Sequence, residues 1–326
     1  MGEKNKNLNH DRLFKNLLHL FLDDFLKCFY PDFYQKVDWS RGTRALSESM
    51  DFRGLSIKDT IPRYVDKLQE VYVVGKDEPI LLHFENQSYR QSIFPKRVYD
   101  YNCLIRGNHE NKSVYSFTIC FGTYPNKKDQ DYYEYNTEFG LKTNTFHFNE
   151  VHLKNYLWND PKLSKHPVFW ALSPLMNRKD NVTDEEIMVT SIQKLREEYY
   201  NIGTDKARCI ILFLDFYFKP DETKVSLVLK RVNELLSERE DEIMSAIAKD
   251  FNVVSQARVR TEMLELIING KFYNGQGIPD DIRQNINRIE DKRIIEDLVV
   301  TVSKIDANDL PRLDEEIHKA VLQLTI

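Results

Sequence analysis

An acid and an amide interrupt the apolar segment ILLHFENQS, residues 80–88, in which most side chains are expected to be buried. Side chains alternate between the two faces of a β-strand, so Glu85 and Gln87 point to the same face. Asp66 lies in the preceding segment, RYVDKLQEVYVV. If the turn GKDE at 75–78 joins the two segments as a hairpin, Asp66 and Glu85 meet at one end of the sheet. Two converging carboxylates supply the hard oxygen ligands that Mg²⁺ prefers.

A magnesium ion at such a site polarises a phosphoryl oxygen and lowers the pKa of its bound water, and both effects promote hydrolysis of a phosphodiester bond. Asp11, on the first expected helix, is a further acid that belongs to this hypothesis. A solvated strand edge followed by a turn gives the same spacing of acids, so spacing alone leaves that alternative open.

The elements that must position these residues form a mixed α/β unit. Helices are expected where apolar residues recur at three- and four-residue steps, and strands where β-branched and aromatic residues alternate or cluster. The expected elements are a helix over 10–29 that ends before Pro31, strands over 63–74 and 80–87, a helix over 93–108, a buried strand over 114–122, and edge strands over 132–140 and 146–153.

Helical patterns dominate after Pro167. A capping box at Thr183 and Glu186 begins a helix that ends near Gly203. Further helices are expected over 205–218, 222–238, 240–250, 255–269 and 282–304, with a loop at 270–281. We therefore predict an α/β domain over 1–175 and an all-helical region over 176–326.

The composition indicates a globular protein without a strong charge bias. The 326 residues carry a net charge of −5, with 30% charged and 41% apolar residues. There is no global basic field of the kind that coats DNA, although a local basic groove is compatible with this charge. The four cysteines lack metal-ligand spacing, and no apolar segment approaches the roughly 20 residues of a membrane span. With no signal-peptide pattern at the N-terminus, we expect a cytoplasmic protein with no membrane partner.

Several stretches carry a resemblance to a known family. They are HDRLFKNLLHLFLDDFLKCFYPDFYQKVDW (10–39), VDKLQEVYVV (65–74), ILLHFENQS (80–88), FPKRVYDY (94–101) and HPVFWALSPLM (166–176). In this order they resemble the recombination-promoting nucleases, also called the YhgA-like transposase family, within the PD-(D/E)xK nuclease superfamily. The resemblance covers about the first half of the chain, and the remainder is similar only in its helical character.

The resemblance implies a restriction-endonuclease-like core, in which a central mixed sheet is flanked by helices. It also implies DNA as the partner and Mg²⁺ or another divalent cation as the cofactor. Asp66 and Glu85 would bind the ion, Gln87 would take the place of the usual lysine, and Asp11 would be the acid on the first helix. Glutamine donates hydrogen bonds but carries no charge, so the site would depend more on its metal or act more slowly.

The residues around this motif have competing interpretations. Lys67 and Gln69 stand where the family more often has aliphatic residues, which makes the burial of that strand less certain. Lys67 and Arg97 are candidate phosphate ligands, with a surface salt bridge as an equal alternative for Arg97. For His83 a structural hydrogen bond is favoured over a role as a base or ligand, and for Tyr101 core packing is favoured.

Three other features have less specific readings. The acids Asp23 and Asp24 are expected on a solvated helix face, and the tyrosines of 131–135 either stack on bases or lie at a sheet edge. Near the C-terminus an apolar helix face packs either on the same chain or on a second copy, which leaves a homo-oligomer open. Its residues are Ile286, Ile289, Ile295, Leu298, Val299 and Val302.

Together these observations predict a Mg²⁺-dependent DNA endonuclease, a phosphodiester hydrolase related to recombination and transposition enzymes. The alternative is a catalytically weak or inactive nuclease-fold protein that binds DNA or another protein. The missing lysine and the net negative charge favour that alternative. A transposase proper would require a third metal-binding acid downstream, and the sequence does not identify one.

Overall fold

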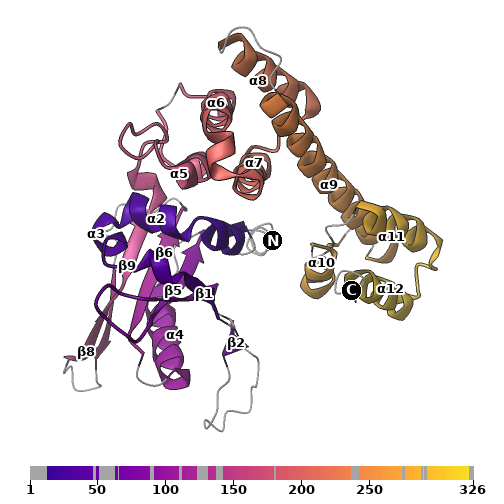
Figure 1. Cartoon of the computed structure of the whole chain (residues 1–326). Helices are drawn as coiled ribbons and strands as arrows, with labels where there is room; N and C mark the ends of the chain where they lie inside the picture. Colours follow the sequence, from indigo (N-terminus) through magenta and orange to yellow (C-terminus); the bar gives the residue numbers. More distant parts are fainter. Residues whose placement is uncertain are drawn as a thin grey trace. The chain divides into compact units, whose positions relative to one another are not determined.

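The structure is a computed structural model in which two compact units are described. The first ends at Phe218 and the second begins at Lys219 (Figure 1). The residues described are 13–46, 49–50, 63–64, 66–88, 92–109, 112–122, 131–136, 142–179, 181–235, 242–273, 276–287, 289 and 292–322.

The first unit is built on a five-stranded mixed sheet, as the sequence predicts for an α/β fold. Its strands, in spatial order, are β1 (Thr43–Ala45), β4 (Lys67–Val71), β5 (Ile80–Gln87), β6 (Val114–Cys120) and β9 (Asn149–His152). The pairs β1–β4 and β4–β5 are antiparallel, whereas β5–β6 and β6–β9 are parallel. A parallel pair needs a crossover connection, and α4 (Phe94–Asn108) lies between β5 and β6 in the chain.

The predicted hairpin between β4 and β5 is present. Gly75 adopts a positive φ of 75° in the connecting turn, a conformation that favours glycine. The register pairs Lys67 with Phe84, so one further step places Asp66, directly before β4, opposite Glu85. All five residues of β4 are buried, so the polar residues after Asp66 do not expose this strand.

Helices cover both faces of β5. Residues 13–20 are helical and are followed by α2 (Leu22–Phe29) and α3 (Pro31–Tyr34), so Pro31 begins a short helix after α2 has ended. The Phe84 ring contacts Phe25 of α2 edge-on, with the ring centroids 6.0 Å apart. The neighbouring residue His83 points to the opposite face and meets Tyr101 of α4 at 6.0 Å. The sheet therefore separates an α2 face from an α4 face.

Four short strands form two separate ribbons. They are β2 (Ser49–Met50) with β3 (Arg63–Tyr64), and β7 (Tyr132–Asn136) with β8 (Lys142–His147). Of the two predicted edge segments, only the second joins the central sheet, through β9. Tyr135 on β7 is 51% exposed, and it lies on this separate ribbon and not at the edge of the central sheet.

The first unit continues past the predicted boundary at residue 175. It includes the helices α5 (Pro167–Leu172), α6 (Asp184–Ile202) and α7 (Thr204–Phe218) and the 3-10 turns η1 (Trp39–Arg41), η2 (Leu153–Asn155) and η3 (Ser173–Leu175). The predicted capping box at Thr183 and Glu186 is confirmed at the start of α6. The unit extends beyond residue 175 because α7 packs on the first helix. The rings of Phe213 and Phe14 meet edge-on there, with their centroids 5.5 Å apart.

Asp24 was predicted on a solvated face, and that prediction is wrong. Its side chain is 14% exposed and accepts hydrogen bonds from Val168 N at 2.8 Å and His166 Nδ1 at 2.9 Å. The carboxylate thus satisfies a backbone N–H in the first turn of α5. Asp23 is 53% exposed and lies 3.8 Å from Lys206 Nζ.

The second unit is helical, with boundaries that differ from the predicted ones. Its helices are α8 (Glu222–Leu235), α9 (Glu242–Phe272), α10 (Asp280–Asn287), α11 (Lys292–Lys304) and α12 (Leu310–Leu322). The two segments predicted over 240–250 and 255–269 form one continuous helix, and the segment 282–304 is two helices. Just after α10, the backbone N–H of Ile289 donates to the Ile286 carbonyl at 3.0 Å.

The apolar face predicted near the C-terminus packs inside this second unit. Its residues Ile286, Ile289, Ile295, Leu298 and Val302 are buried in a core that α9 to α12 share. Packing on the same chain therefore accounts for this face. In the parts of the chain that the structure describes, no helix has both the length and the apolar character needed to cross a membrane.

Candidate active site

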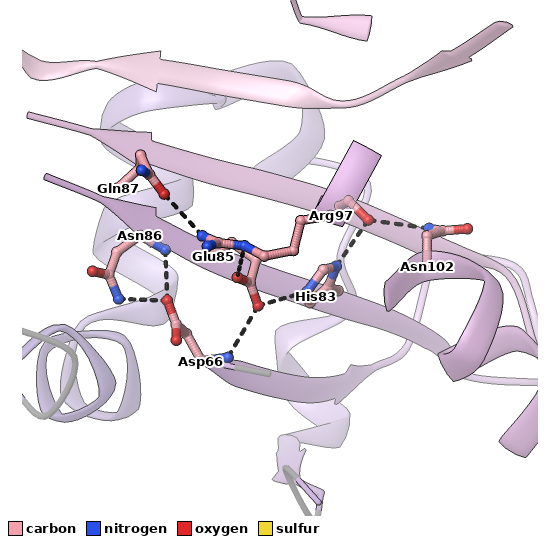
Figure 2. A network of polar contacts seen from close by, with 8 residues as sticks. Asp66, His83, Glu85, Asn86, Gln87, Arg97 and Asn102 are labelled. Carbon is pink, nitrogen blue, oxygen red and sulfur yellow. Dashed lines mark hydrogen bonds and ion pairs between the residues drawn. The ribbon is translucent and has the colours of Figure 1, made fainter. Parts of the chain in front are cut away.

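The end of the β4–β5 hairpin brings the two predicted metal ligands into contact. The backbone N–H of Asp66 donates to Glu85 Oε1 at 3.2 Å. The Asp66 carboxylate in turn accepts bonds from the backbone and the side chain of Asn86, at 2.7 and 2.6 Å (Figure 2). The antiparallel register accounts for this arrangement, because it sets Asp66 opposite Glu85 and beside Asn86.

Glu85 is a buried carboxylate with a cationic neighbour. Its side chain is 3% exposed, and Oε2 lies 3.7 Å from Nε of Arg97, which projects from α4. The same guanidinium donates from Nη2 to Gln87 Oε1 at 2.8 Å, so it lies across both residues of the Glu-x-Gln motif (Figure 2). A buried carboxylate is costly without a paired charge, and Arg97 supplies that charge here.

His83 holds Glu85 from the other side. Its ring is fully buried, and burial, with a smaller contribution from Arg97, lowers the pKa of His83 to about 3. The ring is therefore neutral at physiological pH. Nε2 lies 3.2 Å from Glu85 Oε1, and because a carboxylate only accepts, this nitrogen carries the proton.

The second ring nitrogen of His83 extends the network into β6 and α4. Nδ1 lies 3.0 Å from Ser116 Oγ, which accepts a bond from Asn102 Nδ2 at 3.1 Å. The Ser116 hydroxyl can then donate to Nδ1, so each group has a consistent role. These hydrogen bonds match the structural role favoured for His83. Their effect is to hold the Glu85 carboxylate in place.

Among the other predicted site residues, Gln87 and Arg97 join this network, whereas Lys67 lies on the other face of the sheet. Lys67 is paired with Phe84 and shares its face of the sheet, opposite to the face of Glu85. It is 9% exposed, so its position gives no support to the predicted phosphate contact. Asp11 lies outside the described residues.

Three members of the network were not singled out from the sequence. Asn86 lies inside the motif, but strand alternation assigned it to the opposite face. Its contact with Asp66 arises at the strand edge, where a backbone N–H and a side-chain amide can bind one oxygen. Ser116 and Asn102 carry no local signal, because their partners lie on other elements.

The donors of this site suit a hard divalent cation in their chemistry. Asp66 and Glu85 offer carboxylate oxygens at the same sheet end, and His83 keeps Glu85 in place. Across the described ranges, no three or more His, Cys, Asp or Glu side chains are gathered as a ready metal cluster. An ion bound here would therefore have few protein ligands and keep several water molecules, as Mg²⁺ commonly does.

Comparisons with known proteins leave the family of this chain open. A scan against protein-family models found no match, and searches of curated proteins and of solved structures found none either.

Proposed function

We propose that this protein is a metal-dependent DNA endonuclease that hydrolyses phosphodiester bonds, built on a PD-(D/E)xK-type core related to the recombination-promoting nucleases. The observation that carries the proposal is the contact between Asp66 and Glu85 at the end of the β4–β5 hairpin. The antiparallel hairpin, the helix α4 and the parallel strand β6 follow one another in the order expected for such a core.

In this proposal Asp66 and Glu85 hold Mg²⁺ or a similar ion. The bound ion would polarise a phosphoryl oxygen and lower the pKa of an attacking water. His83 is neutral and donates to Glu85, so it orients the carboxylate without competing as a second cation. Gln87 stands in the lysine position and orients the phosphate or the water through its amide.

Arg97 has two roles in this mechanism, one beside Glu85 and one beside the phosphate. It neutralises Glu85 in the structure, and a divalent cation at Glu85 would repel it. Its Nε–H is buried and makes no hydrogen bond with any described residue, and its side chain is 32% exposed. The guanidinium can therefore turn from Glu85 towards a phosphate oxygen, a geometry for which arginine is well suited.

Cleavage of supercoiled plasmid DNA tests this proposal directly. Purified protein with Mg²⁺ or Mn²⁺ should nick or linearise the plasmid, and EDTA should stop the reaction. Asp66→Asn and Glu85→Gln should abolish cleavage, because they preserve shape but remove a ligand charge. Asp100→Asn, a carboxylate change elsewhere on α4, is the matched control and should cleave as the wild type does. Full activity in Asp66→Asn, or in EDTA, would contradict the proposal.

A second candidate is a nuclease-fold protein that binds DNA without cutting it. The observation that favours it is the pairing of Glu85 with Arg97, which satisfies the acid without a metal. Under this alternative the protein binds DNA with an affinity that falls as salt rises, and no divalent ion produces cleavage. Electrophoretic mobility shifts at two salt concentrations, run beside the plasmid assay, separate the two functions.

A further inference from the structure

The three parallel strands of the central sheet end in pairs of residues that lie side by side. Each strand carries two such residues, separated by one intervening position, on the same face, and all of them except the buried Cys120 are polar. Across the strands the register aligns them in two rows, Glu85 with Thr118 and Glu150, and Gln87 with Cys120 and His152. The second row contains the last residue of each strand.

These rows lie on the face that α4 covers, since Cys120 packs against Phe94 and Val98 of that helix. The residues between the two rows point to the opposite face; they are Asn86 and the two buried apolar residues Ile119 and Val151. In open α/β sheets, ligands bind at the carboxyl ends of the parallel strands. The polar residues of these two rows are therefore placed where a ligand would bind.

Thr118 gives an independent sign of a ligand. Its side chain is fully buried, and its hydroxyl has no hydrogen-bond partner among the residues that the structure describes. Buried hydroxyls nearly always have one. In the register, Thr118 stands between Glu85 on one side and Glu150 on the other, so its side chain lies on one face of the sheet between two acids.

Glu150 is turned towards this space and can be reached from solvent. Its Oε2 lies 3.5 Å from Cys120 Sγ on the neighbouring strand β6, and the residue is only partly buried. Two strand spacings of about 4.8 Å each separate the backbones of Glu85 and Glu150. Two glutamate side chains on one face can converge across that gap on a single ion, with the Thr118 hydroxyl beneath it.

We propose that Glu85, Thr118 and Glu150 form a second divalent-cation subsite, for which Glu85 is shared with the Asp66 site. The subsite rests on the proposed function only through that shared residue. A carboxylate between two ions is the arrangement of two-metal phosphodiesterases, in which one ion stabilises each of the attacking and leaving oxygens. The donors are two carboxylates and a hydroxyl, so water completes the shell of a hard ion such as Mg²⁺ or Mn²⁺.

The test counts bound Mn²⁺ in the full-length protein, by equilibrium dialysis with electron paramagnetic resonance detection of the free ion. The wild type should bind two ions per chain. Glu150→Gln should bind one, Asp66→Asn should bind one, and Asp100→Asn should bind two. Thr118→Val keeps the side-chain shape and should weaken one of the two sites by about tenfold. Circular dichroism shows whether each variant is folded. If Glu150→Gln does not fold, the Mn²⁺ binding of Thr118→Val still tests the subsite.

The outcomes separate this subsite from the proposed function. If Glu150→Gln and Thr118→Val bind Mn²⁺ as the wild type does, the subsite is overturned, even when Asp66→Asn loses an ion and cleavage. If Glu150→Gln loses one ion while Asp66→Asn loses none, the subsite stands and the Asp66 metal site fails. A wild type that binds no ion also overturns the subsite, as does one that binds a single ion that Glu150→Gln retains.

Discussion

The two faces of β5 are both buried but contain different kinds of side chains. Towards α2, Phe84 stacks on Phe117 with centroids 5.1 Å apart and meets Phe25 edge-on. Towards α4, His83 and Glu85 form a connected polar network with Arg97. The strand is buried over its whole length, so exposure does not explain the difference.

The aromatic face is what folding requires, and the polar face is not. Aromatic contacts of this kind stabilise a core through buried area and ring geometry. A buried polar network at best offsets the cost of removing its groups from water, and an apolar replacement often gives equal or greater stability. We therefore expect this network to serve a property other than stability. Substitutions on each face, compared for stability, test this difference.

The largest effect on stability is expected on the aromatic face. Phe84→Ala removes a fully buried ring and should lower the free energy of unfolding by about 3–5 kcal/mol. Its neighbour Glu85→Gln keeps the side-chain volume and should cost about 1 kcal/mol, while abolishing metal-dependent cleavage. Urea titration of both variants provides the comparison. A Glu85→Gln variant destabilised as much as Phe84→Ala would mean that the polar face is a structural element like the aromatic one.

A second prediction concerns pH, to which only the polar face should respond. The pKa of His83 is lowered to about 3 in the folded protein, against 6.5 for an exposed histidine. Below pH 6.5 the unfolded chain binds a proton that the folded chain does not, so stability falls as pH falls towards 3. The expected slope from this residue is about 1.4 kcal/mol per pH unit, or about 2 kcal/mol between pH 6.5 and 5.

The difference between wild type and His83→Gln isolates this contribution, since other titrating groups are common to both. Thermal or urea unfolding at pH 7.5, 6 and 5 should show a steeper loss for the wild type. Parallel curves for the two proteins would mean that His83 is not held neutral by burial.

The parts of this site that the sequence predicted depend on short-range rules. Strand alternation put Glu85 and Gln87 on one face, and the short turn at Gly75 fixed the register that sets Asp66 opposite Glu85. Both follow from spacings of a few residues. Alternation did not predict the contact of Asn86 with Asp66, because Asp66 lies just before β4, where the regular strand begins.

The parts that were not predicted depend on contacts between distant segments. Asp24 caps α5 through His166 and Val168, more than 140 residues along the chain, and nothing near Asp24 signals that contact. Glu150 joins Thr118 and Glu85 only through the parallel register of β6 and β9, which no local pattern encodes. The position of Glu150 beside Thr118, on which the proposed second subsite depends, is thus set by the topology of the sheet.

The last prediction concerns the smallest chemical change, the removal of one oxygen atom from the polar face. Ser116→Ala deletes the hydroxyl that bonds His83 Nδ1 and accepts from Asn102, leaving both groups buried without that partner. Although alanine is the more apolar residue, stability should fall by about 1–3 kcal/mol, because the lost partner costs more than the removed hydroxyl. Ser113→Ala, an exposed change just before the same strand, should alter stability by less than about 0.5 kcal/mol. If Ser116→Ala instead stabilises the protein, the His83 chain is not holding Glu85, and the polar face loses the rigidity on which a metal site there depends.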